Sequence, residues 1–467
     1  MPKEGKSELL QRYEEMTQQG NLSYLDVDQF DEIAFLYEVK ENYKEALQVV
    51  KNGLKQHPGN TDLLIKEAKY LLYLDNIEDA DMKLSALPYE DEEVIMLKAE
   101  LCLIKKEYVQ AMRLLNSLLD NDNISSDLCL DVMSLLVDFD RMDEVVDFVG
   151  RAVKLLPDTT QVLRELASLY EEKEQFDLAL DVYDQLLDKD PYSNSDWLNL
   201  AKIYAIKKDY EKSIEACDFA LAIDETDINA LSFKGYCLYD SKRYKEAIEI
   251  FKEYAVSEGN KSVAYELIAE CYSVLKKPEE AIIYLLKALE TNPEDVEICY
   301  QLATNYYEAG DINMAIEFLK KAIAIDNKDS TLFSFLGEIY LKQKDFKPAE
   351  DLLKKAVVLD AENEDAYMLL GDLKSMEDMP EEAIPFYQKV LDITPYNIKA
   401  TLKLILAEYN SGNQVKAASL IKYLDDVILQ EENTSKIPDD EKENIMQAKS
   451  MLDTLRDILR NNLGEKI

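Results

Sequence analysis

The side chains that could do chemistry in this 467-residue chain are mainly carboxylates, because 94 residues are Asp or Glu and one, His57, is histidine. Paired carboxylates can serve as general acid and base. Many here lie four apart on predicted helices, loosely paired with lysine, which is typical of a solvated helix face. A single histidine leaves little material for histidine-based catalysis or a metal site. His57 precedes Pro58 at the predicted end of a helix and is interpreted as a surface or C-terminal helix residue rather than a catalytic one.

Other reactive motifs are also missing from the sequence. It contains no glycine-rich phosphate loop, no dinucleotide-type glycine pattern and no G-x-S-x-G. The six cysteines form no C-x-x-C pair, so we expect small core residues in a reducing compartment. Residues 120–123 come nearest to a calcium loop but lack its glycine and distal glutamate. We predict no enzyme, metal or cofactor; an enzyme built on scattered carboxylates is the minor alternative.

Charge and composition narrow the class of protein further. With 53 basic residues the net charge is −41, which repels a phosphate backbone, so direct nucleic-acid binding is not expected. At 47% hydrophobic residues, the chain is too apolar for a disordered acidic protein. Neither an N-terminal apolar signal region nor a long apolar run is visible. We therefore expect a cytoplasmic protein without membrane contact.

An internal repeat of 34 residues predicts the fold. Small residues recur at Gly235, Ala269, Ala303, Gly337 and Gly371, and an alanine follows twelve residues after each. Apolar residues three and four apart indicate two amphipathic helices in each repeat. The small residue of the first helix should let its partner helix approach closely.

These positions resemble the tetratricopeptide repeat family, whose pattern runs Trp/Leu, Leu-Gly/Ala, Tyr, Ala, Phe/Tyr, Ala and Pro. Residues 160–193 carry the pattern as Leu163, Leu166, Ala167, Tyr170, Phe176, Ala179, Tyr183 and Pro191. The resemblance implies an all-α fold, a right-handed superhelical solenoid of about twelve helix–turn–helix units with terminal capping helices. An unbroken frame of nine units covers 92–397.

The predicted organisation has three parts. Residues 1–26 form an N-terminal helix and cap, 27–431 the solenoid, and 432–467 a linker and C-terminal capping helix. That last segment could instead be an amphipathic helix for a partner or a membrane. The predicted units are 27–60, 61–91, 92–125, 126–159, 160–193, 194–227, 228–261, 262–295, 296–329, 330–363, 364–397 and 398–431.

The function predicted is a non-enzymatic protein-binding scaffold, because the array leaves no separate domain for catalysis. The resemblance implies that first helices line a concave face that holds an extended peptide or a partner helix. Its inward positions fall on an acidic and tyrosine-rich stripe, which suits a basic partner segment that also makes apolar contacts. Alternatively, these tyrosines simply pack, since the chain has 29. The partner-binding candidates are Tyr236, Tyr239, Glu266, Glu270, Tyr300, Thr304, Tyr307 and Glu338.

Two other functions stay open. The chain could be an adaptor or regulatory subunit of a larger assembly, in secretion, RNA processing or at the ribosome. The family also includes co-chaperones that clamp a C-terminal carboxylate with Lys, Asn and Arg. Here the nearest residues are Arg164, Asn199 and Lys202, at unsuitable spacing and in acidic surroundings. We expect protein partners and no cofactor; the oligomeric state stays open, with a monomer favoured.

Overall fold

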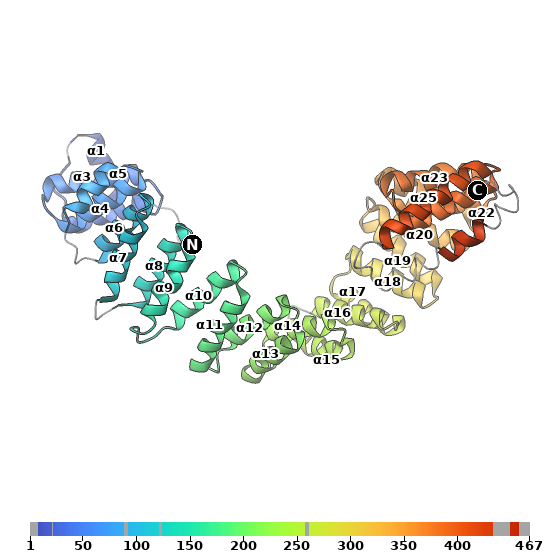
Figure 1. Cartoon of the computed structure of the whole chain (residues 1–467), viewed down its shortest axis with the longest axis horizontal. Helices are drawn as coiled ribbons and strands as arrows, with labels where there is room; N and C mark the ends of the chain where they lie inside the picture. The colour runs from blue at the N-terminus through green and yellow to red at the C-terminus, as the bar shows by residue number, and fades with distance from the viewer. Residues whose placement is uncertain are drawn as a thin grey trace. The chain divides into compact units, whose positions relative to one another are not determined.

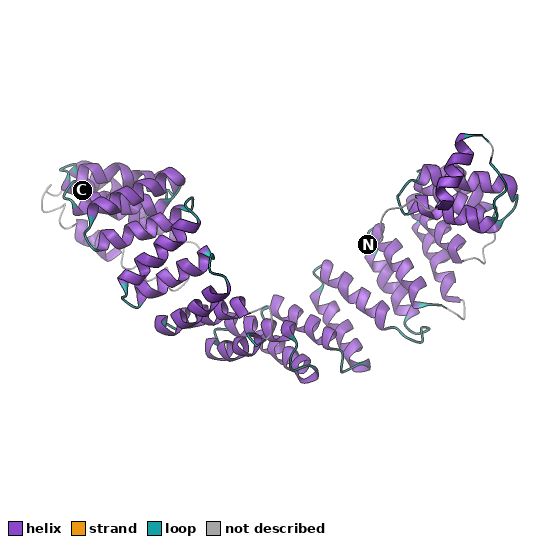
Figure 2. Ribbon diagram, turned by 180° about the vertical axis from the view of Figure 1, so that it is seen from behind, coloured by secondary structure: helices purple, strands orange, loops and turns teal. Residues whose placement is uncertain are grey.

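The computed structural model describes residues 8–20, 22–87, 92–120, 124–256, 261–432 and 449–456. Within these residues every regular element is a helix and none is a strand (Figure 2). The predicted all-α repeat class is therefore confirmed. The chain divides into an N-terminal unit, Met1–Ile203, and a C-terminal unit, Tyr204–Ile467.

The N-terminal unit consists of short helices joined by tight turns. The second helix of its second pair, α5, is only nine residues long, in the region where the sequence shortens the repeat. Its elements are α1 (Glu8–Gln18), α2 (Val27–Glu38), α3 (Tyr43–Gln56), α4 (Thr61–Tyr73), α5 (Ile77–Ser85), α6 (Glu92–Ile104), α7 (Tyr108–Ser117), the 3₁₀ turn η1 (Leu118–Asp120), α8 (Ser126–Asp138), α9 (Met142–Ala152), α10 (Thr160–Glu172), α11 (Phe176–Lys189) and most of α12 (Asn194–Ile206).

The C-terminal unit continues the same alternation of first and second helices (Figure 1). Residues 449–456 add a further helical segment. The other elements are α13 (Tyr210–Ile223), α14 (Ile228–Asp240), α15 (Tyr244–Tyr254), α16 (Lys261–Val274), α17 (Pro278–Thr291), α18 (Val296–Glu308), α19 (Ile312–Ile325), α20 (Ser330–Lys342), α21 (Phe346–Leu359), α22 (Glu364–Met376), α23 (Pro380–Ile393), α24 (Ile398–Asn410) and α25 (Gln414–Glu432).

Repeated capping residues explain where the first helices begin. Asp295, Asp329, Asn363 and Asn397 lie 34 residues apart, and each accepts a hydrogen bond from a backbone N–H in the following first turn. Such side chains satisfy donors that the helix itself leaves unpaired. The starts of these four first helices, α18, α20, α22 and α24, are thus encoded locally, in the same register as the repeat.

The first helices end in a turn whose residue has left-handed backbone geometry. In the C-terminal unit, φ is 64° at Lys242, 58° at Lys276, 86° at Gly310, 63° at Lys344 and 62° at Asp378, again 34 apart. At the first of these turns, the N–H of Arg243 donates to the carbonyl of Leu238 at 2.8 Å. This hydrogen bond closes a Schellman motif, which ends a helix and reverses the chain.

Close approach of the two helices in a repeat depends on the predicted small residues. A Cβ added at Gly371 would lie 2.4 Å from the ring of Tyr387, and one at Gly337 would lie 2.8 Å from Cγ of Leu353. Contacts under 3 Å force something to move, so glycine leaves room for the large residue of the second helix. The expected role of the small positions is confirmed at these sites.

The described ends of the chain pack on their neighbouring repeats. Leu10 and Tyr13 of α1 are buried in one cluster with Phe30 of α2. Leu452 and Leu455 are buried in one cluster with Leu424 and Ile428 of α25 and with residues of α24. These contacts remove apolar surface from water at both ends, which a repeat array needs. The predicted linker lies largely in 433–448, outside the described residues, and the bounds of the repeats stay predictions.

Candidate functional site

The single histidine has a structural environment. His57 follows α3, where its Nε2 lies 2.7 Å from the backbone oxygen of Leu25. Its ring meets the edges of Tyr24 and Phe30. These contacts join α3 to the segment before α2, and they leave the imidazole without an acidic or nucleophilic partner among the described side chains.

The cysteines are free thiols set in the helix cores. Five are buried and Cys102 is half-buried. Burial raises the pKa of Cys129 to about 11 and the pKa values of Cys217 and Cys271 to about 12. They therefore stay protonated at neutral pH, where a thiol is a poor nucleophile and a poor metal ligand. The described part of the chain holds no group of three or more His, Cys, Asp or Glu suited to a metal; residues 121–123 lie outside it.

The first half of the predicted stripe lies on α14 and α16. Tyr236 is 43% exposed and its ring meets the edge of Phe251. The Tyr239 hydroxyl donates to Glu270 at 2.7 Å, which joins the two helices. Burial raises the pKa of Tyr239, and the hydrogen bond and charge of Glu270 raise it further, so the phenol stays a donor. An aromatic ring and a carboxylate thus stand side by side at the surface.

Glu266 completes the acidic part of this stripe, one turn before Glu270 on α16. It accepts a hydrogen bond from Ser262 at 3.2 Å. Burial raises its pKa most; the Ser262 hydrogen bond opposes this, while the charges of Asp295 and Glu297 add to it. Neither Glu266 nor Glu270 forms an ion pair within the described residues. This stretch of surface therefore carries uncompensated negative charge.

The second half of the stripe, on α18 and α20, differs in charge from the prediction. Tyr300 and Tyr307 both lie edge-on to Phe335, with ring centroids 5.8 and 5.7 Å away. Lys342 donates to the Tyr307 hydroxyl at 2.6 Å and pairs with Glu338 at 2.8 Å. Here Lys342 neutralises the carboxylate of Glu338, and the half-buried rings of Tyr300, Tyr307 and Phe335 make this part of the stripe aromatic rather than acidic.

Thr304 does not join these residues in a polar contact. Its hydroxyl donates to the backbone oxygen of Tyr300 on its own helix, at 3.1 Å. Ser334, which occupies the inward position equivalent to Tyr300 in the next repeat, is buried, and its hydroxyl likewise donates to the backbone oxygen of Ser330. The small hydroxyl positions therefore satisfy themselves within their helices and offer little to a partner.

A cavity of about 480 Å³ continues the surface beyond Glu338, and periodicity did not identify it. Leu341, Leu369 and Met376 supply apolar walls, while the ion pairs of Lys342 with Glu338 and of Lys403 with Asp372 stand at its sides. Met376 is 48% exposed and adds apolar surface to this cavity. The only sequence signal was the apolar Met376 one turn beyond the inward position Asp372.

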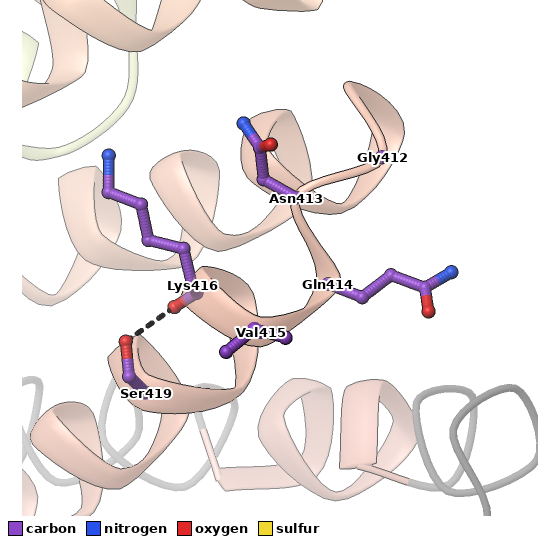
Figure 3. Close-up of a pocket in the computed structure, with 6 residues that line it drawn as sticks. All are labelled: Gly412, Asn413, Gln414, Val415, Lys416 and Ser419. Atoms are coloured by element: carbon purple, nitrogen blue, oxygen red, sulfur yellow. Dashed lines mark hydrogen bonds between the residues drawn. The ribbon is translucent and has the colours of Figure 1, made fainter.

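A larger depression of about 610 Å³ lies at the turn into α25 (Figure 3). Gly412 and Asn413 form the turn, and the drawn side chains of Gln414 and Lys416 point away from each other. The only hydrogen bond drawn joins Ser419 to the backbone oxygen of Lys416. Because its polar groups point in different directions, this depression offers no converging set of ligands and is not a candidate binding site.

The residues nearest to a carboxylate clamp are occupied by contacts within the N-terminal unit. The Nε and Nη2 atoms of Arg164 donate to the two carboxylate oxygens of Asp196, at 2.9 and 2.8 Å, and Asp196 is only 1% exposed. Lys202 donates to Asn199 at 3.2 Å on the same helix. The Arg164 side chain is 44% exposed, but its charge is paired with Asp196, and this pair ties α10 to α12.

Several family models match stretches of this sequence. Models described as tetratricopeptide repeat match 164–228, 275–331, 306–373 and 364–397. A model described as subunit 3 of the anaphase-promoting complex, or cyclosome, matches 206–288. One described as ChAPs, the Chs5p-Arf1p-binding proteins, matches 74–186.

Individual relatives are distant and are matched in part. The human DnaJ homolog subfamily C member 7 is 24% identical over 220 residues, 44% of this chain and 44% of that protein. Anaphase-promoting complex subunit 7 of Dictyostelium discoideum is 30% identical over 102 residues, 22% of this chain and 17% of that protein. The matches thus span less than half the length of these curated relatives. The solved structure of yeast Tom70 matches 93% of this chain and 96% of its own, with 15% identity and a TM-score of 0.43.

None of the described helices is long and apolar enough to cross a bilayer.

Proposed function

The chain is a tetratricopeptide repeat protein, and from this premise we propose that it is a non-enzymatic scaffold that binds a partner polypeptide on the first helices of its C-terminal unit. The partner segment carries Lys or Arg at one end and apolar side chains at the other. Its cations meet Glu266 and Glu270, and its apolar residues meet the tyrosines and the cavity beyond Glu338.

One observation carries this proposal: the exposed ring of Tyr236 lies near the carboxylate of Glu270, which no described cation neutralises. Tyr236 is 43% exposed near the Tyr239–Glu270 pair. Aromatic side chains supply large contact areas at interfaces, and their faces attract cations. The neutralised pair Glu338–Lys342 separates this acidic part from the apolar cavity. The surface is therefore acidic at one end and apolar at the other, and this difference sets the expected orientation of the partner.

The test is affinity capture of partners from the native lysate with the full chain and its variants, quantified by mass spectrometry. Tyr236→Ala with Tyr300→Ala should weaken binding of the main partner about tenfold or more, as expected for two aromatic contacts. Helix content should stay unchanged, because both rings are partly exposed. Glu266→Gln with Glu270→Gln should weaken binding at low salt far more than at high salt.

Tyr192→Ala with Tyr396→Ala is the matched control. These tyrosines are 79% and 58% exposed in turns outside the stripe. Equal loss of partner in this control and in the Tyr236/Tyr300 variant would contradict the proposed surface. Full retention in the Tyr236/Tyr300 variant would contradict it as well.

A second candidate function is that of an adaptor subunit within a larger assembly. The match of 206–288 to the model of an anaphase-promoting complex subunit favours this class. It also overlaps the start of the proposed surface, at Tyr236 and Tyr239. An adaptor should co-purify at fixed stoichiometry with several proteins, whereas a scaffold for single peptides should exchange one partner for another.

The co-chaperone function is less well supported. A carboxylate clamp needs exposed cations and amides that converge, but Arg164 is held by the buried Asp196. We propose a cytoplasmic protein that is monomeric without its partner. Light scattering of the purified chain tests the monomer directly.

A further inference from the structure

A cavity of about 640 Å³ opens on the first helices of the N-terminal unit, separate from the surface discussed above. Its wall comes from three consecutive first helices, α4, α6 and α8. Tyr73, Met96 and Leu135 supply apolar surface, and Tyr73 is 40% exposed. Such a mixture of apolar surface and polar groups in one hollow is typical of a binding pocket.

Almost all the charged side chains that line this cavity are acidic. Six carboxylates line it, from Glu92, Glu93, Glu100, Asp127, Asp131 and Asp138, against one cation, Lys69. Lys69 already donates to Glu38 outside the cavity, at 2.7 Å. Glu100, Asp131 and Asp138 form no ion pair within the described residues. The cavity thus keeps a strong negative field, and an occupant must be cationic.

Glu100 is one of the carboxylates that line this cavity. Its side chain is half-buried on α6, and burial raises its pKa most. The charge of Lys69 lowers that pKa and the charge of Asp138 raises it further. A bound Lys or Arg would relieve the repulsion between Glu100 and Asp138, since it brings positive charge into a partly desolvated site.

Spacing along the helices defines the occupant further. Glu93 and Glu100 lie seven residues apart on α6, and so do Asp131 and Asp138 on α8. Seven residues of α-helix span about 10.5 Å. On α6 and on α8 an apolar side chain, Met96 or Leu135, stands between the two carboxylates. A helix that presents two cations two turns apart, with an apolar residue between them, matches this pattern of charge and apolar surface.

We propose that this cavity is a second docking surface, which takes an amphipathic basic helix of a protein partner. The two cations of that helix meet the carboxylates of α6 and α8, and its apolar residue packs against Met96, Leu135 and Tyr73. The surface uses residues of the N-terminal unit alone, so it does not depend on the surface of the C-terminal unit.

The test titrates the full chain into a fluorescein-labelled helical peptide that carries two lysines seven positions apart and leucine between them. A counterpart with glutamate in place of lysine serves as the second probe. Fluorescence anisotropy is read at low and high salt. The lysine peptide should bind and weaken with salt, and the glutamate peptide should not bind. Absence of binding, or equal binding of both peptides, would overturn the proposal.

Glu100→Gln with Asp131→Asn localises the contact. It should weaken binding about tenfold, the size expected for two partly exposed charge contacts. Asp181→Asn with Asp188→Asn is the control, because it removes the same charge from exposed positions of α11. Equal weakening of peptide binding in both variants would indicate diffuse electrostatic attraction and would contradict the proposal. So would loss of binding only in the Tyr236/Tyr300 variant, which would assign the probe to the C-terminal unit.

Discussion

The ring of Phe251 lies directly against the Cα of Gly235: a Cβ added at this glycine would lie 2.3 Å from Cε1 of the ring. Gly235 belongs to α14 and Phe251 to α15, so this contact sets how closely the two helices of one repeat approach. Both residues are buried, Phe251 completely. The equivalent residues of the next repeat are Ala269 and Leu285, both buried in one core cluster.

Gly235→Ala should therefore lower the free energy of unfolding by about 1–3 kcal/mol, the usual cost of overpacking a core. Phe251→Leu in the same chain should recover much of that loss, because it reproduces the pair Ala269 and Leu285. Urea unfolding of the single and double variants measures the coupling between the two positions. Additive effects would show that the two side chains do not compete for the same space.

At a left-handed turn residue, substitution by glycine should increase the stability of the chain, whereas Gly235→Ala decreases it. Lys242 holds a φ of 64°, where a side chain costs free energy that glycine does not. Lys242→Gly should stabilise the chain by about 0.5–1 kcal/mol, after the greater freedom of glycine in the unfolded chain is counted. Gly310→Ala, at the equivalent turn with a φ of 86°, should destabilise it by about 1 kcal/mol. Thermal unfolding of both variants tests the two predictions. A loss of stability in Lys242→Gly would contradict the backbone strain inferred at Lys242.

The repeat register could be read from the sequence because small residues, caps and turns all recur with one period. Gly235 and Gly371 were identified as points of close approach, and Asp295 and Asn363 cap the helices in that same register. Each of these roles depends on a residue and its near neighbours in the chain. Such local rules survive without knowledge of the tertiary structure.

The charge of the candidate surface could not be read in the same way. Lys342 lies beside Glu338 and also reaches Tyr307, 35 residues earlier, so its effect depends on contacts between repeats. The cavity wall formed by Leu369 and Met376 likewise needs three neighbouring first helices. Periodicity gives the face of a helix that a residue occupies, but not the partner that a long side chain chooses there.

Glu38 should make the stability of the N-terminal unit depend on pH. Its carboxylate accepts hydrogen bonds from Lys69 and from the fully buried Tyr70, both at 2.7 Å. Burial raises the pKa of Glu38, but these two hydrogen bonds outweigh it, and the pKa lies below its usual value. Stability from this group is complete above the ordinary glutamate pKa near 4.5 and is lost as the pH falls through the lowered pKa.

Glu38→Gln should therefore unfold more easily than wild type at pH 7, by about 1–3 kcal/mol. The difference should shrink as the pH falls below about 4, because wild type then loses its own carboxylate. Urea titrations at several pH values measure this difference in the free energy of unfolding between Glu38→Gln and wild type. Glu32→Gln, at an exposed position of the same helix, should match wild type at pH 7. A gap for Glu38→Gln that stays constant down to pH 3 would exclude a role for the charge.

Arg164 should be needed in its own geometry rather than as a positive charge alone. Its two bonds to Asp196 and a third to Ser193, at 3.1 Å, use the planar guanidinium fork. Arg164→Met leaves the buried carboxylate without a cation and should cost about 1–3 kcal/mol. Arg164→Lys should restore less than half of the stability that Arg164→Met loses. The double variant Arg164→Met with Asp196→Asn should be more stable than Arg164→Met alone, because no buried charge is then left unpaired. Thermal unfolding checks the series, and a wild-type melting point for Arg164→Lys would contradict the need for two bonds.

The buried cysteines have a consequence for how the opening of the array can be followed. Cys217, Cys237, Cys271 and Cys299 fall in four successive predicted repeats, and each thiol is buried. An alkylating reagent reaches such a thiol only when its repeat opens, so the labelling rate at each cysteine reports the local opening equilibrium. Mass spectrometry of the labelled peptides would resolve those rates one repeat at a time. The natural sequence thus already carries a series of internal reporters, and no probe has to be engineered into it.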